Sequence, residues 1–198
     1  MSIKGWKQLG PFYFYTVVVT VLLAFAVTGN GLSASRIVLL LLFGLLSWGL
    51  IEYVLHRFVF HFDARSIIAR KFVYAAHLSH HENPKTTDHL LASLQISLPI
   101  ATAYWLLAWA ALGTWRAASY LFTGLVVGYF FYEWLHFQAH HCRSRLPLLR
   151  YLKKYHLLHH YRTPNLRFGV TSPVFDFLFG TYEPVRKTVK ASARRGAH

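Results

Sequence analysis

Four apolar stretches divide the chain, at residues 12–28, 37–55, 90–112 and 117–135. A helix needs roughly 20 apolar residues to cross a bilayer. Each stretch is bounded by charge, Gly or Pro and holds no Lys or Arg in its core. We therefore predict an all-α integral membrane protein with about four transmembrane helices. These form a single domain over residues 1–186, followed by a basic flexible tail at residues 187–198.

The first stretch has an alternative interpretation. Ala24, Phe25 and Ala26 would serve as a signal-peptidase cleavage site, although the apolar run is long for a signal peptide. Cleavage there would leave the orientation of the later helices unchanged.

Basic residues predict how the helices are oriented. They gather before the first stretch, between the second and third, and after the fourth, whereas the other two loops carry only Arg36 and Arg116. Because basic loops stay on the cytoplasmic side, we expect both termini and the middle loop to face the cytoplasm.

The overall composition supports a membrane location. Hydrophobic residues make up 55% of the chain and charged residues only 14%, too few to cover the surface of an ordinary soluble domain. The formal net charge of +14 therefore indicates anionic lipid headgroups as a partner, and not nucleic acid. The single cysteine, Cys142, excludes an internal disulfide and a zinc site built on cysteines.

Thirteen histidines are the most unusual feature of the composition, and most of them fall into four clusters. The clusters are HRFVFH from His56, HLSHH from His77, HFQAHH from His136 and HLLHH from His156. Residues three or four apart share one face of a helix, so the second and fourth clusters should each converge, as should His136 and His140. His56 and His61 are five apart, about 140° around a helix, and would serve two different metals, or one metal if the helix frays.

Topology places all four clusters on one side of the membrane. The first and third clusters end the second and fourth helices, which are two crossings apart, and the other two follow in cytoplasmic segments. One such cluster alone would be better explained by surface or packing histidines. Four clusters at helical spacing on one face favour a shared role, and so many neutral imidazoles suit two metal ions with about four to six ligands each.

The histidine clusters and the segments around them resemble the fatty acid hydroxylase superfamily of integral membrane di-metal enzymes, which includes sterol desaturases and oxidases. The resemblance covers residues 52–182. Its most specific part is LPLLRYLKKYHLLHHY at residues 146–161, extended by FGVTSPVFD at 168–176 and FGTY at 179–182. This signature is closest to that of the fatty acid and sphingolipid 2-hydroxylases, and EYVLHRFVFH at residues 52–61 is similar to their first histidine box.

The resemblance implies a cytoplasmic helical cap that holds a di-metal site. Ten histidines carry over as metal ligands: His56, His61, His77, His80, His81, His136, His140, His156, His159 and His160. His141 stays an open candidate because its position varies among relatives, and His89 matches no motif. The implied cofactors are two metal ions, iron in the working enzyme, with zinc as an alternative in a purified form.

Three departures from the family pattern bear on substrate and partners. Leu78 stands where the 2-hydroxylases have Gly in the second box, and residues 82–88 do not follow their usual spacing. The N-terminal cytochrome b5 domain of many eukaryotic relatives is absent. We therefore expect a separate electron donor, either of the cytochrome b5 type or a ferredoxin with its reductase.

Carboxylates near the clusters are candidates to accept hydrogen bonds from the ligand imidazoles. Glu52 lies four residues before His56 and Glu133 three before His136, on the ligand side of their helices, with ion pairing at the helix end as the alternative role. Asp176 lies in the signature segment. Asp88 is a further candidate, with helix capping as its alternative.

The resemblance implies O2-dependent hydroxylation of a lipid C–H bond, at C2 of a fatty acyl chain or sphingolipid. No amino-acid side chain can oxidise an unactivated C–H bond, so the metal ions must supply this chemistry. A sterol or carotenoid hydroxylase or desaturase is the alternative with the same chemistry. A membrane metal transporter or sensor is the alternative of another class, although transporters place ionisable residues in mid-membrane. The lack of an evident ER-retrieval signal favours a bacterial inner membrane.

Overall fold

The computed structural model describes residues 9–28, 31–86 and 91–185, and every regular element within these ranges is helical. The long helices are α2 (Gly10–Val27), α3 (Ala34–Val54), α6 (Leu94–Leu112) and α7 (Trp115–His141). The shorter ones are η1 (Leu55–Phe60), α4 (Ile67–Val73), η2 (Tyr74–Leu78), α5 (Ser79–Glu82), α8 (Pro147–Tyr161) and α9 (Val174–Leu178). The predicted all-helical class is confirmed for the described residues, and the predicted tail at 187–198 lies outside them.

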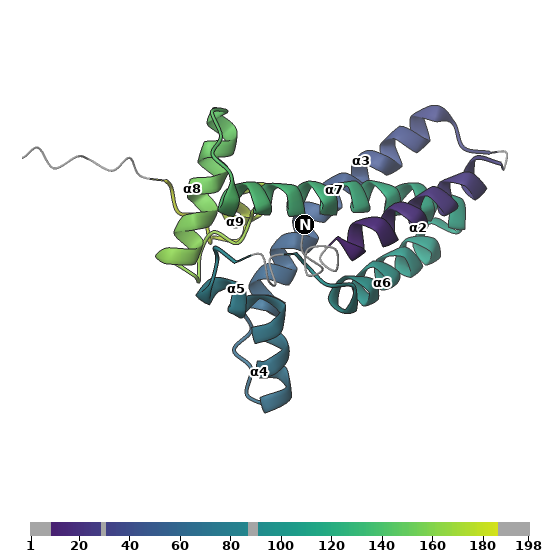
Figure 1. Ribbon diagram of the computed structural model, residues 1–198. Coiled ribbons are helices and arrows are strands. Elements are labelled where there is room, and N and C mark those ends of the chain that lie inside the picture. Colours follow the sequence, from purple (N-terminus) through teal and green to yellow (C-terminus); the bar gives the residue numbers. More distant parts are fainter. Residues whose placement is uncertain (1–8, 29–30, 87–90, 186–198) are drawn as a thin grey trace, which may run out of the picture.

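The four long helices form an elongated bundle, and the short helices gather at one end of it (Figure 1). Three of the long helices, α2, α3 and α6, are long and apolar enough to cross a membrane, and most of their side chains are not buried. The predicted fourth crossing coincides with α7, which is less apolar and packs against the other three. A helix that faces protein on most sides needs less apolar surface than one that faces lipid, which explains the lower hydropathy of α7.

Glycines bring the backbones of α3 and α7 into direct contact. A Cβ atom built on Gly44 would lie 1.9 Å from the carbonyl oxygen of Leu121, and one built on Gly124 would lie 2.1 Å from that of Leu41. A Cβ on Gly128 would lie 2.5 Å from the Cβ of Trp48. No side chain fits at these positions, so the small residues allow a close helix pair of the kind found between membrane helices.

This contact aligns the ends of the two helices. Gly44 meets Gly124, and Trp48, four residues on, meets Gly128, so α3 and α7 run in the same direction. His56 follows Gly44 by twelve residues, and His136 follows Gly124 by twelve residues. At 1.5 Å per residue both histidines lie about 18 Å beyond the crossing, at the same depth.

The short helices close the end of the bundle where α3 and α7 finish. α4, η2 and α5 form one arm that projects sideways from this end, and α8 crosses the end of α7 (Figure 1). α8 begins at Pro147, a residue that suits the first helical turn because its missing N–H would have no partner there. α9 returns to pack against α3, so the C-terminal segment is tied to the bundle.

We expect Gly124→Ala to lower the stability of the fold and Gly10→Ala to leave it unchanged. The first change forces α3 and α7 apart, and overpacking typically costs about 1–3 kcal/mol. A Cβ on Gly10 meets nothing within 4 Å, so this control shares the gain in helix propensity without the clash. The measurement is the midpoint of thermal unfolding in detergent. Equal midpoints for both variants would show that the backbones do not need this contact.

Candidate metal centre

Ten histidines from η1 and its C-cap, η2, α5, α7 and α8 converge into two groups. The first group holds His56, His61, His77, His81 and His159, and the second holds His80, His136, His140, His156 and His160. Within each group one ring nitrogen per residue lies within 4.8 Å of all the others. These are the ten residues that the sequence resemblance carries over, and the structure brings all of them together. Two groups of five also fit the expectation of two ions.

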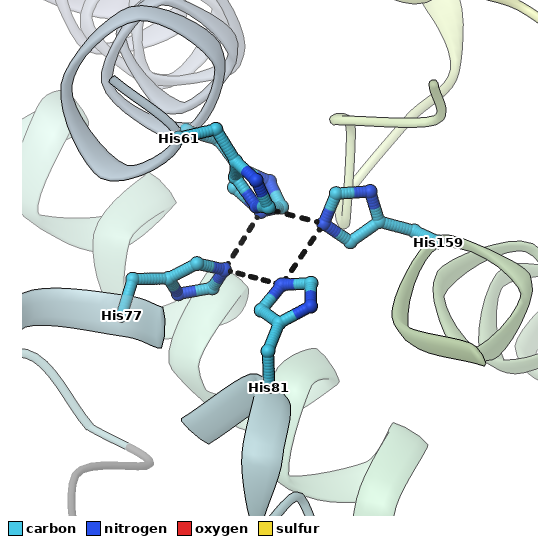
Figure 2. A group of neighbouring side chains, drawn as sticks. His61, His77, His81 and His159 are labelled. Carbon is cyan, nitrogen blue, oxygen red and sulfur yellow. Dashed lines mark hydrogen bonds between the residues drawn. The ribbon is translucent and has the colours of Figure 1, made fainter. Parts of the chain in front are cut away.

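The first group surrounds a common point with its Nε2 atoms. His77 Nε2 lies 3.0 Å from that of His56 and 2.9 Å from that of His81. His159 Nε2 lies 3.1 Å from that of His81 and 3.2 Å from that of His61. Figure 2 shows four of these rings, which come from the ends of separate helices and point toward one centre.

The second group has the same arrangement. His140 Nε2 lies 3.1 Å from that of His80 and 3.0 Å from that of His156, which in turn lies 3.0 Å from that of His160. Both ring nitrogens of His136 are buried and have no hydrogen-bond partner among the described residues. A buried polar atom without a partner is costly, so this ring calls for a ligand that the protein does not itself supply.

A π-helical turn explains how His56 and His61 enter the same group. The N–H of His61 donates to the carbonyl oxygen of His56, five residues earlier, over 3.1 Å. Residues five apart share one face of such a turn, and the two ring centroids lie 5.1 Å apart. His56 and His61 therefore lie in the same group, which favours one shared metal over two different metals. The helix widens here; it does not fray.

The helical spacing predicted that the histidines of the second cluster, and those of the fourth, each converge. In the structure both clusters are divided between the two groups. His77 and His81 belong to the first group, whereas His80 between them belongs to the second. In the fourth cluster His159 belongs to the first group and its neighbours to the second. Three rings on one helix face are too widely spaced to meet at one point, and the two groups are close enough for neighbouring rings to enter different groups. α5 and α8 each contribute to both.

The spacing and chemistry of the rings fit metal ions. Ligand nitrogens at about 2.0–2.1 Å from an ion lie roughly 3 Å from one another, which matches the separations above. The Nδ1–H of His56 donates to the carbonyl oxygen of Phe168 over 2.5 Å, and that of His159 to the carbonyl of Leu166 over 2.8 Å. Since a carbonyl only accepts, each ring carries its proton on Nδ1 and presents a lone pair at Nε2. Converging lone pairs repel unless a cation lies between them.

Burial keeps the rings in the neutral form that binds metal. Loss of hydration lowers the pKa of His61 and of His80 to about 4, and that of His81 to about 3. The same loss of hydration, with neighbouring imidazoles adding to it, lowers the pKa of His77 and His159 well below the ordinary value. Protons therefore compete little with metal for these nitrogens at neutral pH.

The segment that orients His56 and His159 is held by two buried carboxylates. Glu52 accepts hydrogen bonds from the backbone N–H groups of Val170 and Thr171 and from the Thr171 hydroxyl. Asp176 accepts from the N–H groups of Phe168 and Gly169 at 2.7 and 2.8 Å. These donors belong to residues 168–171, directly beside the two carbonyls that accept from the imidazoles.

The carboxylates were expected to bind imidazole N–H groups directly, and in the structure they do not. Glu52 and Asp176 act one step further out, through the backbone of residues 166–171. Glu133 accepts from the N–H of Ala92 over 2.9 Å, which ties α7 to the start of α6. For His56 and His159, backbone carbonyls accept the imidazole N–H instead. Because every residue has a carbonyl, no sequence signal marks Leu166 or Phe168 for this role.

Of the remaining candidates, the structure describes His141, which lies outside both groups. His141 is exposed at the end of α7, where its ring packs on Phe137 at 5.0 Å between centroids. It follows His140 by one residue and so points about 100° away from the ligand face. Asp88 and His89 lie outside the described residues.

An apolar cavity opens beside the first group. His56 lines one end, and the walls come from α2, α3, α6 and α7. The lining residues are Tyr15, Trp48, Ile51, Glu52, Leu55, His56, Phe60, Ala92, Ile96, Ser97, Ile100, Ala101, Leu125, Val126, Tyr129 and Tyr132. The sequence does not single out the α2 and α6 members of this wall, because they carry no motif and come together only in the bundle.

A sequence model of the fatty acid hydroxylase family matches residues 41–181, which include all ten converging histidines. The chain belongs to this family. The resemblance to this family is therefore confirmed by sequence, and the fold is similar to that of a solved relative.

Related proteins of this family are 2-hydroxylases. The chain is 34% identical to dihydroceramide fatty acyl 2-hydroxylase FAH2 of Arabidopsis thaliana, over 82% of this chain and 68% of that protein. It is 39% identical to FAH1 of the same plant, over 76% of this chain and 63% of that one. It is 42% identical to ceramide very long chain fatty acid hydroxylase SCS7 of Saccharomyces cerevisiae, over 70% of this chain and 36% of that one.

The fold agrees with these sequence comparisons. The visible hydroxylase domain of full-length Scs7p superposes with a TM-score of 0.81 at 34% identity, over 90% of this chain and 67% of that one. The chain thus spans between about a third and two thirds of the length of the relatives described here. It superposes on the visible hydroxylase domain of Scs7p.

We expect Glu52→Gln to weaken metal binding at the first group while the second group keeps its ion. Gln has the same shape but loses the charge that holds residues 168–171, and changes behind a ligand typically weaken metal affinity by about 10–100-fold. Iron per chain after anaerobic purification and dialysis should therefore fall from about two toward one. Glu82→Gln is the matched control, since Glu82 is exposed and accepts only from the Tyr74 hydroxyl. Full retention of iron, or loss from both groups together, would show that Glu52 does not act on His56 through the backbone of residues 168–171.

Proposed function

We propose that the chain hydroxylates the fatty acyl chain of a ceramide or related lipid at C2, using O2, two external electrons and two histidine-bound iron ions. The overall reaction converts R–H, O2, two electrons and two protons to R–OH and water. The observation that carries the proposal is the apolar cavity that begins at His56 of the first group and runs between the long helices. The 2-hydroxylase relatives support the position of attack.

The ten histidines of the two groups are proposed as the iron ligands. Bound iron would supply the oxidising power toward an unactivated C–H bond that no side chain carries. The protein holds the ligand rings in position through the carbonyls of Leu166 and Phe168, and these carbonyls through Glu52 and Asp176. His56 belongs to the first group and also lines the cavity, so substrate in the cavity would approach the centre that this group would hold.

The cavity determines which carbon reaches the metal centre. Its lining is almost entirely apolar, so an acyl chain is bound by burial of its methylenes, each worth about 0.8 kcal/mol. Along α7 the lining extends from Tyr132, near His136, up to Leu125, which is eleven residues from that ligand. We propose that the acyl tail fills this length and that its carbonyl end lies toward His56, in keeping with the C2 position named for the relatives. Closure of the cavity by side chains also keeps water from the reacting carbon.

The positive-inside pattern and the location of the two groups at one end of the bundle support a site on the cytoplasmic face of the membrane. The relatives described above are eukaryotic. A bacterial inner membrane remains our prediction for the source compartment, and the electron donor is proposed to be a cytochrome b5-type protein or a ferredoxin with its reductase.

Expression in a host without endogenous 2-hydroxylase tests the proposed activity. We expect 2-hydroxy fatty acids among the hydrolysed sphingolipids of cells with the native chain, and a loss of at least about a hundredfold with His159→Ala, because the first group loses a ligand. His141→Ala is the control, and it should retain activity because His141 lies outside both groups. Mass spectrometry with 18O2 identifies the position and the oxygen source. Hydroxylation at another carbon, desaturation, or no new product would each reject the C2 assignment.

We expect Ala101→Phe to shift the product toward shorter acyl chains. Ala101 is buried and lines the cavity on α6. It lies farther along this helix from the metal centre than Ile96 and Ser97, so a phenyl ring there shortens the space for the acyl tail. The matched control is Ala103→Phe on the same helix, where the side chain is exposed. The measurement is the chain-length distribution of the 2-hydroxy acids. An unchanged distribution with unchanged total product would show that the acyl tail lies elsewhere.

A further inference from the structure

α8 has a second face, opposite its ligands. At 100° per residue, His156, His159 and His160 point to one side of the helix, while Arg150, Lys154 and Tyr161 point to the other. This outer face forms one wall of a groove of about 1070 Å³. Its lining residues are Arg143, Ser144, Arg150, Lys153, Lys154, Leu157, Leu158, Tyr161 and Arg162.

The groove is strongly positive. Between Glu133 and Asp176 the sequence contains seven Lys and Arg residues and no Asp or Glu. Five of the seven line the groove. Lys153 Nζ donates to the carbonyl of Cys142 over 2.7 Å, which fixes one of these charges at the junction of α7 and α8. A concentrated positive field of this kind attracts a negatively charged partner.

The groove also has an apolar floor. Leu157, Leu158 and Tyr161 lie among the charges, and Tyr161 is 60% exposed. An apolar centre with a charged rim, rich in Arg and Tyr, is the typical composition of a protein-binding surface. A surface that binds only lipid headgroups requires positive charge but no apolar floor.

Its position favours a soluble partner over the membrane. α7 has 27 residues and is thus about 40 Å long, whereas the hydrocarbon core of a bilayer is about 30 Å. Phe137 is the last large apolar residue exposed on α7, and the groove begins beyond the end of this helix at Arg143.

The groove lies one helix away from the metal centre. Leu158 and Tyr161 are direct sequence neighbours of His159 and His160. An α-helix with side chains is about 10–12 Å across, so a molecule bound in the groove is separated from the ligand imidazoles by this width alone. α8 is the one helix of the described residues that carries ligands of both groups on one face and a groove on the other.

We propose that the groove on the outer face of α8 is the docking site of an acidic one-electron carrier protein, which reduces the metal centre through α8. The proposal rests on the proposed oxygenase function. In each turnover two reduced carriers bind in succession, each is oxidised by one electron, and the two electrons with two protons from water complete the reduction of O2. The carrier is recognised by a negative surface around its exposed redox centre.

The charge-reversal variant R143E/R150E tests the site. Arg143 is in the loop before α8 and Arg150 is in its first turn, where Glu is compatible with the helix dipole. The control R65E/R70E changes the same number of charges, one in a loop and one on α4, on another part of the cap. All proteins are placed in nanodiscs of neutral phosphatidylcholine, and the probe is the acidic haem domain of a cytochrome b5 with its NADH reductase.

We expect R143E/R150E to weaken binding of the haem domain, and to lower the rate that it supports, by about tenfold or more at low salt. With dithionite as the electron source the variant should match the native protein, because a small reductant needs no docking surface. Raised salt should reduce the difference between the variant and the native protein. The control should bind the haem domain as the native protein does.

Other outcomes overturn the proposal in distinguishable ways. An equal loss with dithionite would show damage to the fold or metal centre, and an unchanged rate with the haem domain would show that docking lies elsewhere. A defect that appears only after anionic phosphatidylserine is added would assign the groove to lipid headgroups. If the native protein forms no product with either reductant, the proposed function itself fails, whereas binding of the haem domain can still be measured.

Discussion

Mutual repulsion of nitrogen lone pairs is the constraint on which the rest of this structure depends. Ten neutral imidazoles face one another in two groups, with Nε2 atoms about 3 Å apart. Such an arrangement fits a cation at each of the two centres, as we propose. The chain must therefore bring ligands from five helical segments to common points and hold each ring in the tautomer that presents a lone pair. Its glycine contacts, π-helical turns and buried carboxylates all serve this requirement.

Alignment comes first, because ligands on separate helices are useful only at one depth. The contact of Gly44 with Gly124 joins α3 and α7 without side chains between them, and equal distances along both helices then place His56 and His136 level. The π-helical turn at the end of α3 adds His61 to the group of His56. Helix packing thus determines the depth of His56 and His136 along the bundle. The local change from α-helix to π-helix determines that His61 faces the same group as His56.

Orientation of the rings depends on a segment that has no metal ligand of its own. Residues 166–171 place two backbone carbonyls against the Nδ1–H groups of His56 and His159. Glu52 and Asp176 hold that backbone through its N–H groups. α8 links this inner arrangement to the outside, because its inner face carries ligands of both groups and its outer face carries the positive groove. The same helix thus joins the chemistry to the surface from which electrons are proposed to arrive.

The sequence alone determined the helical class, the apolar stretches, the ten converging histidines and the family. These follow from local properties, since apolar length and histidine spacing are visible in the order of residues. It did not determine which histidine belongs to which group, because His80 and His159 are assigned by the packing of α5 and α8 against other helices. It also did not reveal the carbonyls of Leu166 and Phe168, the indirect role of Glu52 or the wall of the cavity. Each of these depends on atoms far apart in the chain that only the tertiary structure brings into contact.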